Sequence, residues 1–277
     1  MELKSVIEGI AQNTSEHVKA VDGDYILDGL LHCGKCKTRK QTRVEMPWGT
    51  FTPYCVCKCE REKQEKEDEA RARAEKIERC RRNAFYDCHM ERKTFENADG
   101  SNEKIMNAMK KYVENFEQYR EAGKGLLLFG TTGTGKTYAA ACVANALINK
   151  GVSVKMTDFT RIENAVSDMF GKRQEYYNEL NNFDLLIIDD LNTERKTEYM
   201  KEIVYNVINS RVLSGRPLII TTNLTNKELQ KADDVHFQRV FSRLFEACIP
   251  IEVNGEDKRY KKLKMDIEPM KRELGLL

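Results

Sequence analysis

Short, mostly apolar runs alternate with helix-like segments from about residue 105 to residue 253. Runs of this kind are typical of strands that are buried on both faces in a parallel sheet. The segments between them have helical spacing or contain strong helix formers, as in the alanine-rich stretch 138–148. The pattern therefore predicts buried strands joined by helices, with the strands at 125–129, 152–156, 183–190, 217–223 and 249–253.

The first 82 residues follow a different pattern. Residues 1 to about 30 predict a modest amphipathic helix and then a turn at 22–24; its apolar positions are Val6, Ile7, Ile10 and Val18. Residues 37–52 alternate between apolar and polar positions around Pro47-Trp48-Gly49, which favours a small β-hairpin. Nearly every residue from Glu60 to Arg82 is charged, so we expect a solvent-exposed linker helix there.

A glycine-rich loop separates the strand 125–129 from the helix 138–148. Its sequence fits the phosphate-binding pattern G-x-x-x-x-G-K-[ST] and reads Gly130-Thr131-Thr132-Gly133-Thr134-Gly135-Lys136-Thr137. Such glycines let the backbone N–H groups face phosphate oxygens, and the helix N-terminus adds positive potential. We predict that this loop and the adjoining Tyr138 bind a nucleoside triphosphate. Lys136 would reach the β- and γ-phosphates, and the Thr137 hydroxyl would bind Mg²⁺.

Paired carboxylates end the apolar strand 183–190, which is a Walker B pattern. In this pattern the first acid, Asp189, holds Mg²⁺ through its water shell, and the second can orient the attacking water. That second acid is Asp190, which is one methylene shorter than the glutamate of many ATPases. Glu194, four residues beyond it, is the alternative for the polarising role.

Three further polar residues are candidates for the same site. Asn223 follows the strand 217–223, so it would lie at the carboxyl edge of the sheet and point at the γ-phosphate or the lytic water. Arg243 precedes the last strand closely enough to lie at the domain edge, where an arginine can insert into a neighbouring subunit's ATP site. Arg259, in the basic run 258–264, could contact the nucleotide of its own chain, or the whole run could contact nucleic-acid phosphates.

Five of the nine cysteines lie between residues 33 and 59, on both sides of the predicted hairpin. Two cysteine pairs around a hairpin form the zinc-ribbon arrangement, in which four thiolates hold one tetrahedral ion. We favour Cys33, Cys36, Cys57 and Cys59 as the zinc ligands and keep Cys55 as the alternative. Four thiolates leave no open coordination position, so the zinc is expected to be structural.

Composition narrows the cellular setting. Lys and Arg number 46 and Asp and Glu number 44, so the total charge of +2 argues neither for nor against a nucleic-acid partner. No apolar run approaches the roughly 20 residues that span a bilayer, and the N-terminus has no signal-peptide pattern. We therefore expect a cytoplasmic protein without a membrane partner, in which cysteines are thiols or metal ligands rather than disulfides.

The ordered set of P-loop, Walker B strand, Asn223, Arg243 and Arg259 resembles the AAA+ ATPases of the DnaC/DnaI bacterial helicase-loader family and their transposition relative IstB. The resemblance covers roughly residues 90–265. Its more specific marks are Thr94-Phe95-Glu96-Asn97 and Ile187-Ile188-Asp189-Asp190-Leu191-Asn192-Thr193-Glu194. The cysteine pairs are similar to the zinc-binding adaptor of DnaI-like and phage members. The chain departs from the family at Asn192, where glycine is usual, and by its one extra thiol.

The resemblance implies an α/β fold with five parallel strands in 5-1-4-3-2 order and helices on both faces. It further implies that Asn223 is sensor 1, Arg243 an arginine finger acting in trans and Arg259 a sensor 2-like residue. We expect a zinc-binding adaptor at 1–59, a charged helical linker at 60–93, an ATPase domain at 94–265 and a tail at 266–277.

The function that this organisation implies is ATP-controlled loading of a hexameric replicative helicase onto single-stranded DNA. The protein would be an ATPase that uses ATP, Mg²⁺ and Zn²⁺ and self-associates through the ATP site. Two alternatives remain at this point. One is an IstB-type transposition helper acting on double-stranded DNA, and the other is a nucleotide-gated adaptor that hardly hydrolyses ATP.

Overall fold

The computed structural model describes residues 20–167, 169, 172–191, 197–230 and 234–276. The helix predicted near the N-terminus and the candidate Glu194 lie outside these residues. By its internal contacts the chain divides into two compact units, Met1–Glu75 and Lys76–Leu277. The helix α2 (Lys58–Arg82) runs through the division without a break and has no buried residue, which agrees with the exposed charged helix predicted there.

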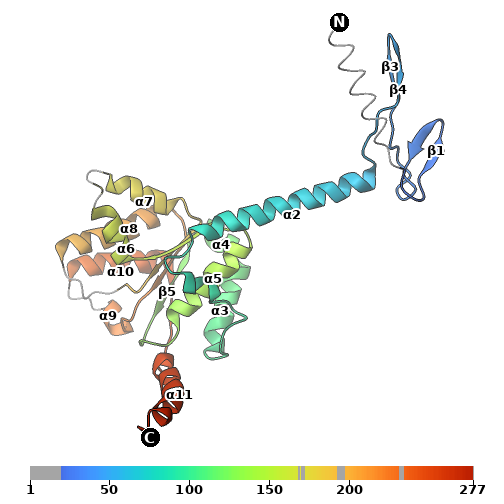
Figure 1. Ribbon diagram of the computed structural model, residues 1–277. Coiled ribbons are helices and arrows are strands. Elements are labelled where there is room, and N and C mark those ends of the chain that lie inside the picture. The colour runs from blue at the N-terminus through green and yellow to red at the C-terminus, as the bar shows by residue number, and fades with distance from the viewer. Residues whose placement is uncertain (1–19, 168, 170–171, 192–196, 231–233, 277) are drawn as a thin grey trace. The chain divides into compact units, whose positions relative to one another are not determined.

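The first unit contains two antiparallel hairpins (Figure 1). The strands β3 (Val44–Met46) and β4 (Gly49–Phe51) form the hairpin that the alternating pattern predicts. The strands β1 (Tyr25–Leu27) and β2 (Leu30–His32) form another that the sequence analysis missed. Its signal was present, because Asp28-Gly29 lies between apolar residues and both take positive φ, 53° and 73°, as a two-residue hairpin turn requires.

The second unit is built on one parallel sheet of five strands. In chain order these are β5 (Gly125–Phe129), β6 (Val154–Asp158), β7 (Leu185–Asp189), β8 (Leu218–Thr221) and β9 (Cys248–Glu252). They lie side by side as β6-β7-β8-β5-β9. Counted within this sheet the order is 5-1-4-3-2, which confirms the predicted fold.

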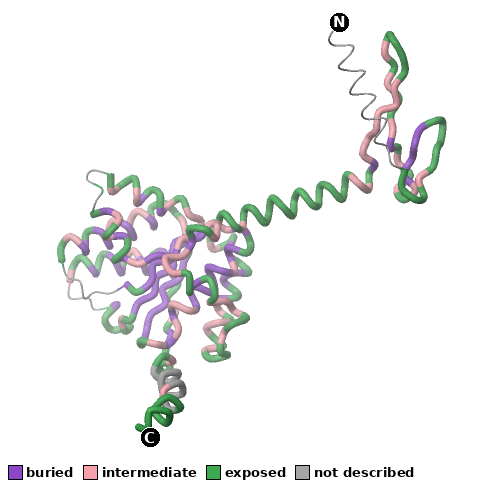
Figure 2. The backbone as a smooth tube through the Cα atoms, in the orientation of Figure 1, coloured by how far each residue is buried: buried purple, intermediate pink, exposed green. Residues whose placement is uncertain are grey.

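Helices cover both faces of this sheet, and Figure 2 shows that its strands are largely buried. One face packs against α3 (Glu103–Glu114), α4 (Phe116–Glu121) and α5 (Lys136–Asn149), together with Met90 of the short 3-10 helix η1 (Cys88–Arg92). The other face is covered by α6 (Phe159–Ser167), α7 (Arg173–Asn181), α8 (Glu198–Leu213) and α10 (Val235–Ala247). The short helix α9 (Asn226–Gln230) adds its buried Leu229 to this second layer, and α11 (Lys258–Glu273) follows β9.

A buried arginine holds the amino-terminal edge of the sheet together. Arg211 of α8 is fully buried, and its guanidinium donates hydrogen bonds to backbone carbonyl oxygens around two connections, α7 to β7 and α8 to β8: those of Leu180, Asn181, Phe183, Asp184 and Pro217. Burial lowers the pKa of Arg211 to about 9. These bonds supply donors to carbonyl oxygens that the packing of α8 removes from water beside the strands. The opposite edge, where the carboxyl ends of the strands lie, carries the candidate functional site.

Candidate functional site

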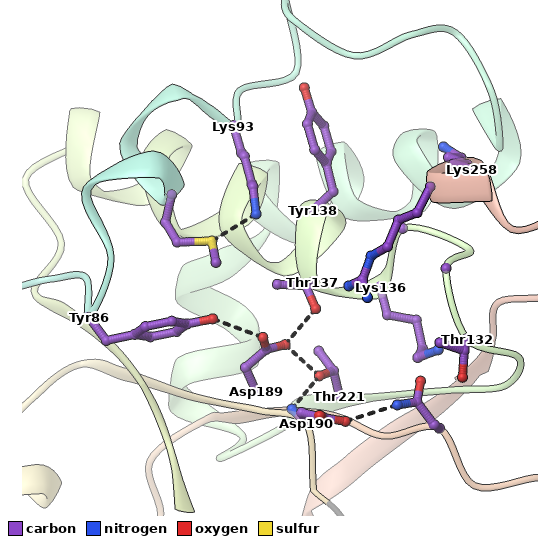
Figure 3. Close-up of a pocket in the computed structure, with 15 residues that line it drawn as sticks. Tyr86, Lys93, Thr132, Lys136, Thr137, Tyr138, Asp189, Asp190, Thr221 and Lys258 are labelled. Carbon is purple, nitrogen blue, oxygen red and sulfur yellow. Dashed lines mark hydrogen bonds between the residues drawn. The ribbon is translucent and has the colours of Figure 1, made fainter. Parts of the chain in front are cut away.

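A cleft of about 380 Å³ opens at the carboxyl edge of the sheet, above the P-loop (Figure 3). Its walls come from β7, β8, the P-loop, the first turn of α11 and the segment that includes η1. The lining residues are Tyr86, Met90, Lys93, Thr132, Gly133, Gly135, Lys136, Thr137, Tyr138, Asp189, Asp190, Thr221, Asn223, Lys258 and Arg259. The fold thus brings most of the predicted nucleotide-site residues into one cavity.

The P-loop has the geometry that its glycines predict. Gly130 and Gly133 have φ of 125° and 76°, and a Cβ at Gly130 would come 2.7 Å from the carbonyl oxygen of Val253. The helix α5 then begins at Lys136, so its N-terminus faces the cleft. Thr134 is buried and donates a hydrogen bond to the carbonyl oxygen of Thr131 at 2.9 Å, which holds the loop from inside.

The Lys136 ammonium is held at the floor of the cleft. Its Nζ donates to the carbonyl oxygens of Gly130 and Thr131 at 3.0 and 2.7 Å. Burial lowers the pKa of Lys136, and the carboxylates of Asp190 and Asp189 oppose this effect. Phosphate oxygens are stronger acceptors than carbonyls, so a bound triphosphate would displace these two bonds and gain a charge-assisted pair.

Asp189 is the centre of a buried hydrogen-bond network. Its Oδ1 accepts from the hydroxyls of Thr137 at 2.8 Å and Thr221 at 2.6 Å, and its Oδ2 accepts from the hydroxyl of Tyr86 at 3.0 Å (Figure 3). The contact between Thr137 and Asp189 joins the two residues predicted to hold Mg²⁺. A hydroxyl beside a carboxylate offers the oxygen ligands that this ion prefers, so the residues present fit it.

Asp190 lies beside Asp189 with an unusual backbone conformation. Its φ of 54° is left-handed, which costs a non-glycine residue free energy and persists only where the surroundings impose it. Its backbone N–H donates to Thr221 Oγ1 at 2.8 Å, and its Oδ1 accepts from Asn223 Nδ2 at 2.9 Å. The sequence predicted separate roles for Asp190 and Asn223, and the fold joins them directly.

Five lining residues escaped the sequence analysis: Tyr86, Met90, Lys93, Lys258 and Thr221. The first three come from the segment that ends in η1, which carries no recognisable motif. Asn145 of α5 fastens this segment, because its Nδ2 donates to the carbonyl oxygens of Met90 and Lys93, both at 2.9 Å. Lys258 begins the basic run from which only Arg259 was selected, and its backbone N–H donates to the carbonyl oxygen of Gly133 at 3.1 Å.

The two predicted arginines are placed differently. Arg259 lines the cleft. Arg243 does not; it lies on α10, where its guanidinium pairs with the Glu246 carboxylate at 2.8 Å and is partly exposed. Phe245 and Ile249, close to it in the chain, are exposed apolar residues.

Four of the clustered cysteines converge in the first unit. The sulfur atoms of Cys33, Cys36, Cys57 and Cys59 all lie within 4.8 Å of one another, with Cys59 Sγ 3.6 Å from Cys33 Sγ and 3.4 Å from Cys57 Sγ. Zinc with four sulfur ligands at about 2.3 Å needs sulfur atoms roughly 3.8 Å apart, so these side chains fit that ion. Cys55 lies apart from this cluster, and its thiol donates to the carbonyl oxygen of Arg39 at 3.5 Å.

A buried ion pair supports the loop that carries the first two cysteines. Asp24 Oδ2 accepts from Lys40 Nζ at 2.6 Å, and Asp24 Oδ1 accepts from the backbone N–H of Gly34 at 3.0 Å. The hydrogen bond from Lys40, together with backbone N–H donors, lowers the pKa of Asp24 to about 2. Asp24 therefore fixes the backbone between Cys33 and Cys36.

Across the parts of the chain that the structure describes, no helix has the length and apolar character needed to cross a membrane.

Comparison with known proteins agrees with this site. The profile of the family described as IstB-like ATP binding protein matches residues 60–265. The replicative helicase loader DnaC of Escherichia coli (strain K12) is 30% identical over 155 residues, which are 54% of this chain and 62% of DnaC. The loader DnaI of Bacillus subtilis (strain 168) is 29% identical over 184 residues, 60% of this chain and 58% of DnaI. The chain thus spans about three fifths of the length of these two loaders.

A phage-like protein and two solved structures extend the comparison. The phage-like element PBSX protein XkdC of Bacillus subtilis (strain 168) is 29% identical over 146 residues, covering 50% of this chain and 53% of XkdC. The crystal structure of the DnaC helicase loader superposes with a TM-score of 0.53 at 23% identity, over 61% of this chain and 100% of that one. The crystal structure of DnaI superposes with a TM-score of 0.51 at 22% identity, over 64% of this chain and 95% of that one. At these identities the two structures show the shared fold. The chain belongs to the IstB-like ATP-binding protein family, has an AAA+ fold and is homologous to the DnaC and DnaI helicase loaders.

Proposed function

We propose that this protein is an ATPase that loads a replicative DNA helicase onto single-stranded DNA during DNA replication. The observation that carries the proposal is the contact between Thr137 and Asp189 in a P-loop cleft whose other carboxylate, Asp190, is held by Asn223. The relatives named as replicative helicase loaders, DnaC and DnaI, support the helicase as the partner.

In the proposed reaction the cleft binds ATP with Mg²⁺. Backbone N–H groups of the P-loop and the Lys136 ammonium would hold the phosphates. Thr137 and Asp189 would hold Mg²⁺. Magnesium, when bound between these residues and the nucleotide, would supply positive charge against the negative charge that develops on the phosphates. Arg259 and Lys258 at the start of α11 add positive charge at the opposite wall.

The attacking water would be oriented by Asp190. The hydrogen bond from Asn223 fixes the orientation of the Asp190 carboxylate at the cleft, which supports this assignment. Glu194 remains the second candidate for the polarising role.

Arg243 would act in trans. It is on the surface of α10 and outside the cleft of its own chain, and the exposed apolar Phe245 and Ile249 lie near it in the sequence. A surface arginine beside apolar residues suits an interface between copies of the chain. Inserted into a neighbour's site, the guanidinium would neutralise transition-state charge, and turnover would then depend on self-association.

The N-terminal part would grip the helicase. We propose that residues 1–59 are a zinc-binding adaptor held by Cys33, Cys36, Cys57 and Cys59, that 60–93 are a linker, 94–265 the ATPase domain and 266–277 a tail. The convergence of four thiols supports the zinc, since so small a unit needs a metal to fold stably.

A transposition helper is the second candidate function, and the description of the family favours it. Such a helper would act on double-stranded DNA. The cysteine cluster and the homology to two loaders favour the loader instead. A nucleotide-gated adaptor with little turnover is the third, and the short side chain of Asp190 is what supports it.

ATP hydrolysis by the purified protein, with and without single-stranded DNA, separates these functions. We expect single-stranded DNA to stimulate turnover more than double-stranded DNA does. Lys136→Ala should lose ATP binding, whereas Arg243→Ala should bind ATP and lose turnover. Lys104→Ala, an exposed change on α3, is the matched control. Preference for double-stranded DNA would favour the transposition helper, and ATP binding without turnover under any condition would favour the adaptor.

A further inference from the structure

One donor to Asp189 comes from the segment between α2 and η1, outside the P-loop and outside the strands of the sheet. The hydroxyl of Tyr86 donates to Asp189 Oδ2 at 3.0 Å, although 103 residues separate the two in sequence. Figure 3 shows the Tyr86 ring reaching across the cleft toward this carboxylate. Tyr86 also lines an adjoining cavity of about 370 Å³ on the side of α6, so it lies at the boundary between the two spaces.

The surroundings of Tyr86 hold it firmly. The carbonyl oxygen of the nearby, fully buried Ala84 accepts from the backbone N–H of Met156 in β6 at 2.6 Å, which ties this segment to the edge strand of the sheet. The Arg161 guanidinium lies 4.8 Å from the centre of the Tyr86 ring and also pairs with Asp158 at 3.3 Å. The position of Tyr86 is therefore set by the anchored backbone at Ala84 and by the contact of its ring with Arg161.

Tyr86 remains a neutral hydrogen-bond donor. Burial, and then the negative charge of Asp189, raise the pKa of the Tyr86 hydroxyl. An ionised carboxylate is an acceptor only, so the proton of this hydrogen bond stays on the tyrosine.

Hydrogen bonds occupy most of the acceptor positions of the Asp189 carboxylate. An ionised carboxylate has about four acceptor positions. Thr137, Thr221 and Tyr86 occupy three of them, which leaves about one for a water molecule on a metal ion. Tyr86 is the only one of these three donors that reaches Oδ2, so it sets how the carboxylate plane is turned.

We propose that Tyr86 is a positioning residue for Asp189, and that it turns this carboxylate toward the Mg²⁺ that accompanies the nucleotide. The inference rests on the proposed function in so far as the cleft must bind ATP with Mg²⁺. It adds that the segment following α2, which carries no motif, supplies the residue that orients the Mg²⁺-binding carboxylate.

The test is the Mg²⁺ dependence of nucleotide binding in Tyr86→Phe. This change removes the hydroxyl and keeps the ring against Arg161. Binding of a fluorescent ATP analogue is titrated first in EDTA and then with increasing Mg²⁺. We expect the affinity in EDTA to stay within about twofold, and the Mg²⁺ midpoint to rise on the order of tenfold, as for outer-shell partners of metal ligands.

Two further proteins make the result specific. Tyr119→Phe removes a hydroxyl from a tyrosine that stacks on Tyr112, outside the cleft, and should leave both values unchanged. In an Asp189→Asn background, Tyr86→Phe should add nothing to the loss of affinity at saturating Mg²⁺, because Tyr86 acts through the carboxylate. A purely structural role would give independent effects.

The outcomes separate this inference from the proposed function. An unchanged Mg²⁺ midpoint in a folded Tyr86→Phe protein that binds the analogue overturns the role of Tyr86 and leaves the ATP site intact. A matching loss of affinity in EDTA and in Mg²⁺ also overturns it, since Tyr86 would then contact the nucleotide or support the fold. If the wild-type protein does not bind the analogue at all, the proposed function itself has failed.

Discussion

Asn223 Nδ2 donates a hydrogen bond to Asp190 Oδ1 at 2.9 Å, and so joins the residues that follow two neighbouring strands, β8 and β7. Asp190 is in the left-handed region, with φ of 54°, and its backbone N–H is bonded to Thr221. The conformation of the second Walker B acid is thus imposed by the neighbouring strand. This arrangement makes Asp190 and Asn223 one unit rather than two separate residues.

Removing Asn223 should therefore impair turnover more than binding. In Asn223→Ala the Asp190 carboxylate loses its fixed orientation, and we expect the rate of ATP hydrolysis to fall about tenfold while ATP affinity changes by less than about threefold. In Asp190→Asn we expect the rate of ATP hydrolysis to fall by about a hundredfold, as for loss of a general base. Steady-state hydrolysis together with equilibrium binding measures both quantities.

The control for this pair is Asn226→Ala, an asparagine of α9 whose amide oxygen bonds to Gln230 away from the cleft. It should behave as wild type. Equal losses of affinity and rate in Asn223→Ala would contradict the pairing and indicate direct contact with the nucleotide.

The cysteine cluster makes a prediction about metal content. Cys57→Ser should lose bound zinc, because Cys57 lies in the four-sulfur cluster, whereas Cys55→Ser should retain zinc equimolar with protein. Elemental analysis of the two purified proteins checks this. Chelation of the wild-type protein should expose the first unit to limited proteolysis. Zinc loss in Cys55→Ser would show that the ligand set differs from the one proposed.

Asn145 should affect affinity rather than chemistry. Its amide fastens Met90 and Lys93, which line the cleft, but does not line the cleft itself. In Asn145→Ala we expect ATP affinity to fall about tenfold, while turnover at saturating ATP stays within about threefold of wild type. The reason is that Met90 and Lys93 would contact the nucleotide equally in the ground state and in the transition state. Asn107→Ala on α3 is the control. A loss confined to turnover would argue against this anchoring role.

Arg211 should be a determinant of stability alone. Arg211→Met leaves several buried carbonyls without a donor, so we expect a cost of at least about 2 kcal/mol. In a unit of this size that lowers the Tm by roughly 5 °C. Arg216→Met, on the same edge but with one exposed bond to the carbonyl of Asn182, should shift the Tm by less than about 2 °C. Differential scanning calorimetry provides the comparison.

Local patterns determined most of the fold. The five core strands, the P-loop, Asp189 and the charged helix were predicted because each depends on a short stretch of chain whose period or spacing is set by backbone geometry. The hairpin at Asp28-Gly29 was also within reach, since its turn signal lies in two adjacent residues, and it was overlooked. The helical spacing of Ile105, Met109, Tyr112 and Phe116 does not reveal the break that the structure has at Asn115, between α3 and α4.

Tertiary structure decided what surrounds these motifs. No local signal links Tyr86 to Asp189 or Asn145 to Lys93, because these contacts depend on how the segment after α2 packs beside β6 and α5. The choice of Cys57 over Cys55 has the same origin: the two are equivalent in spacing, and the path of the folded chain places only Cys57 among the other thiols. A motif fixes the residues within one turn of the chain, whereas a site is completed by side chains that only packing brings within hydrogen-bond distance.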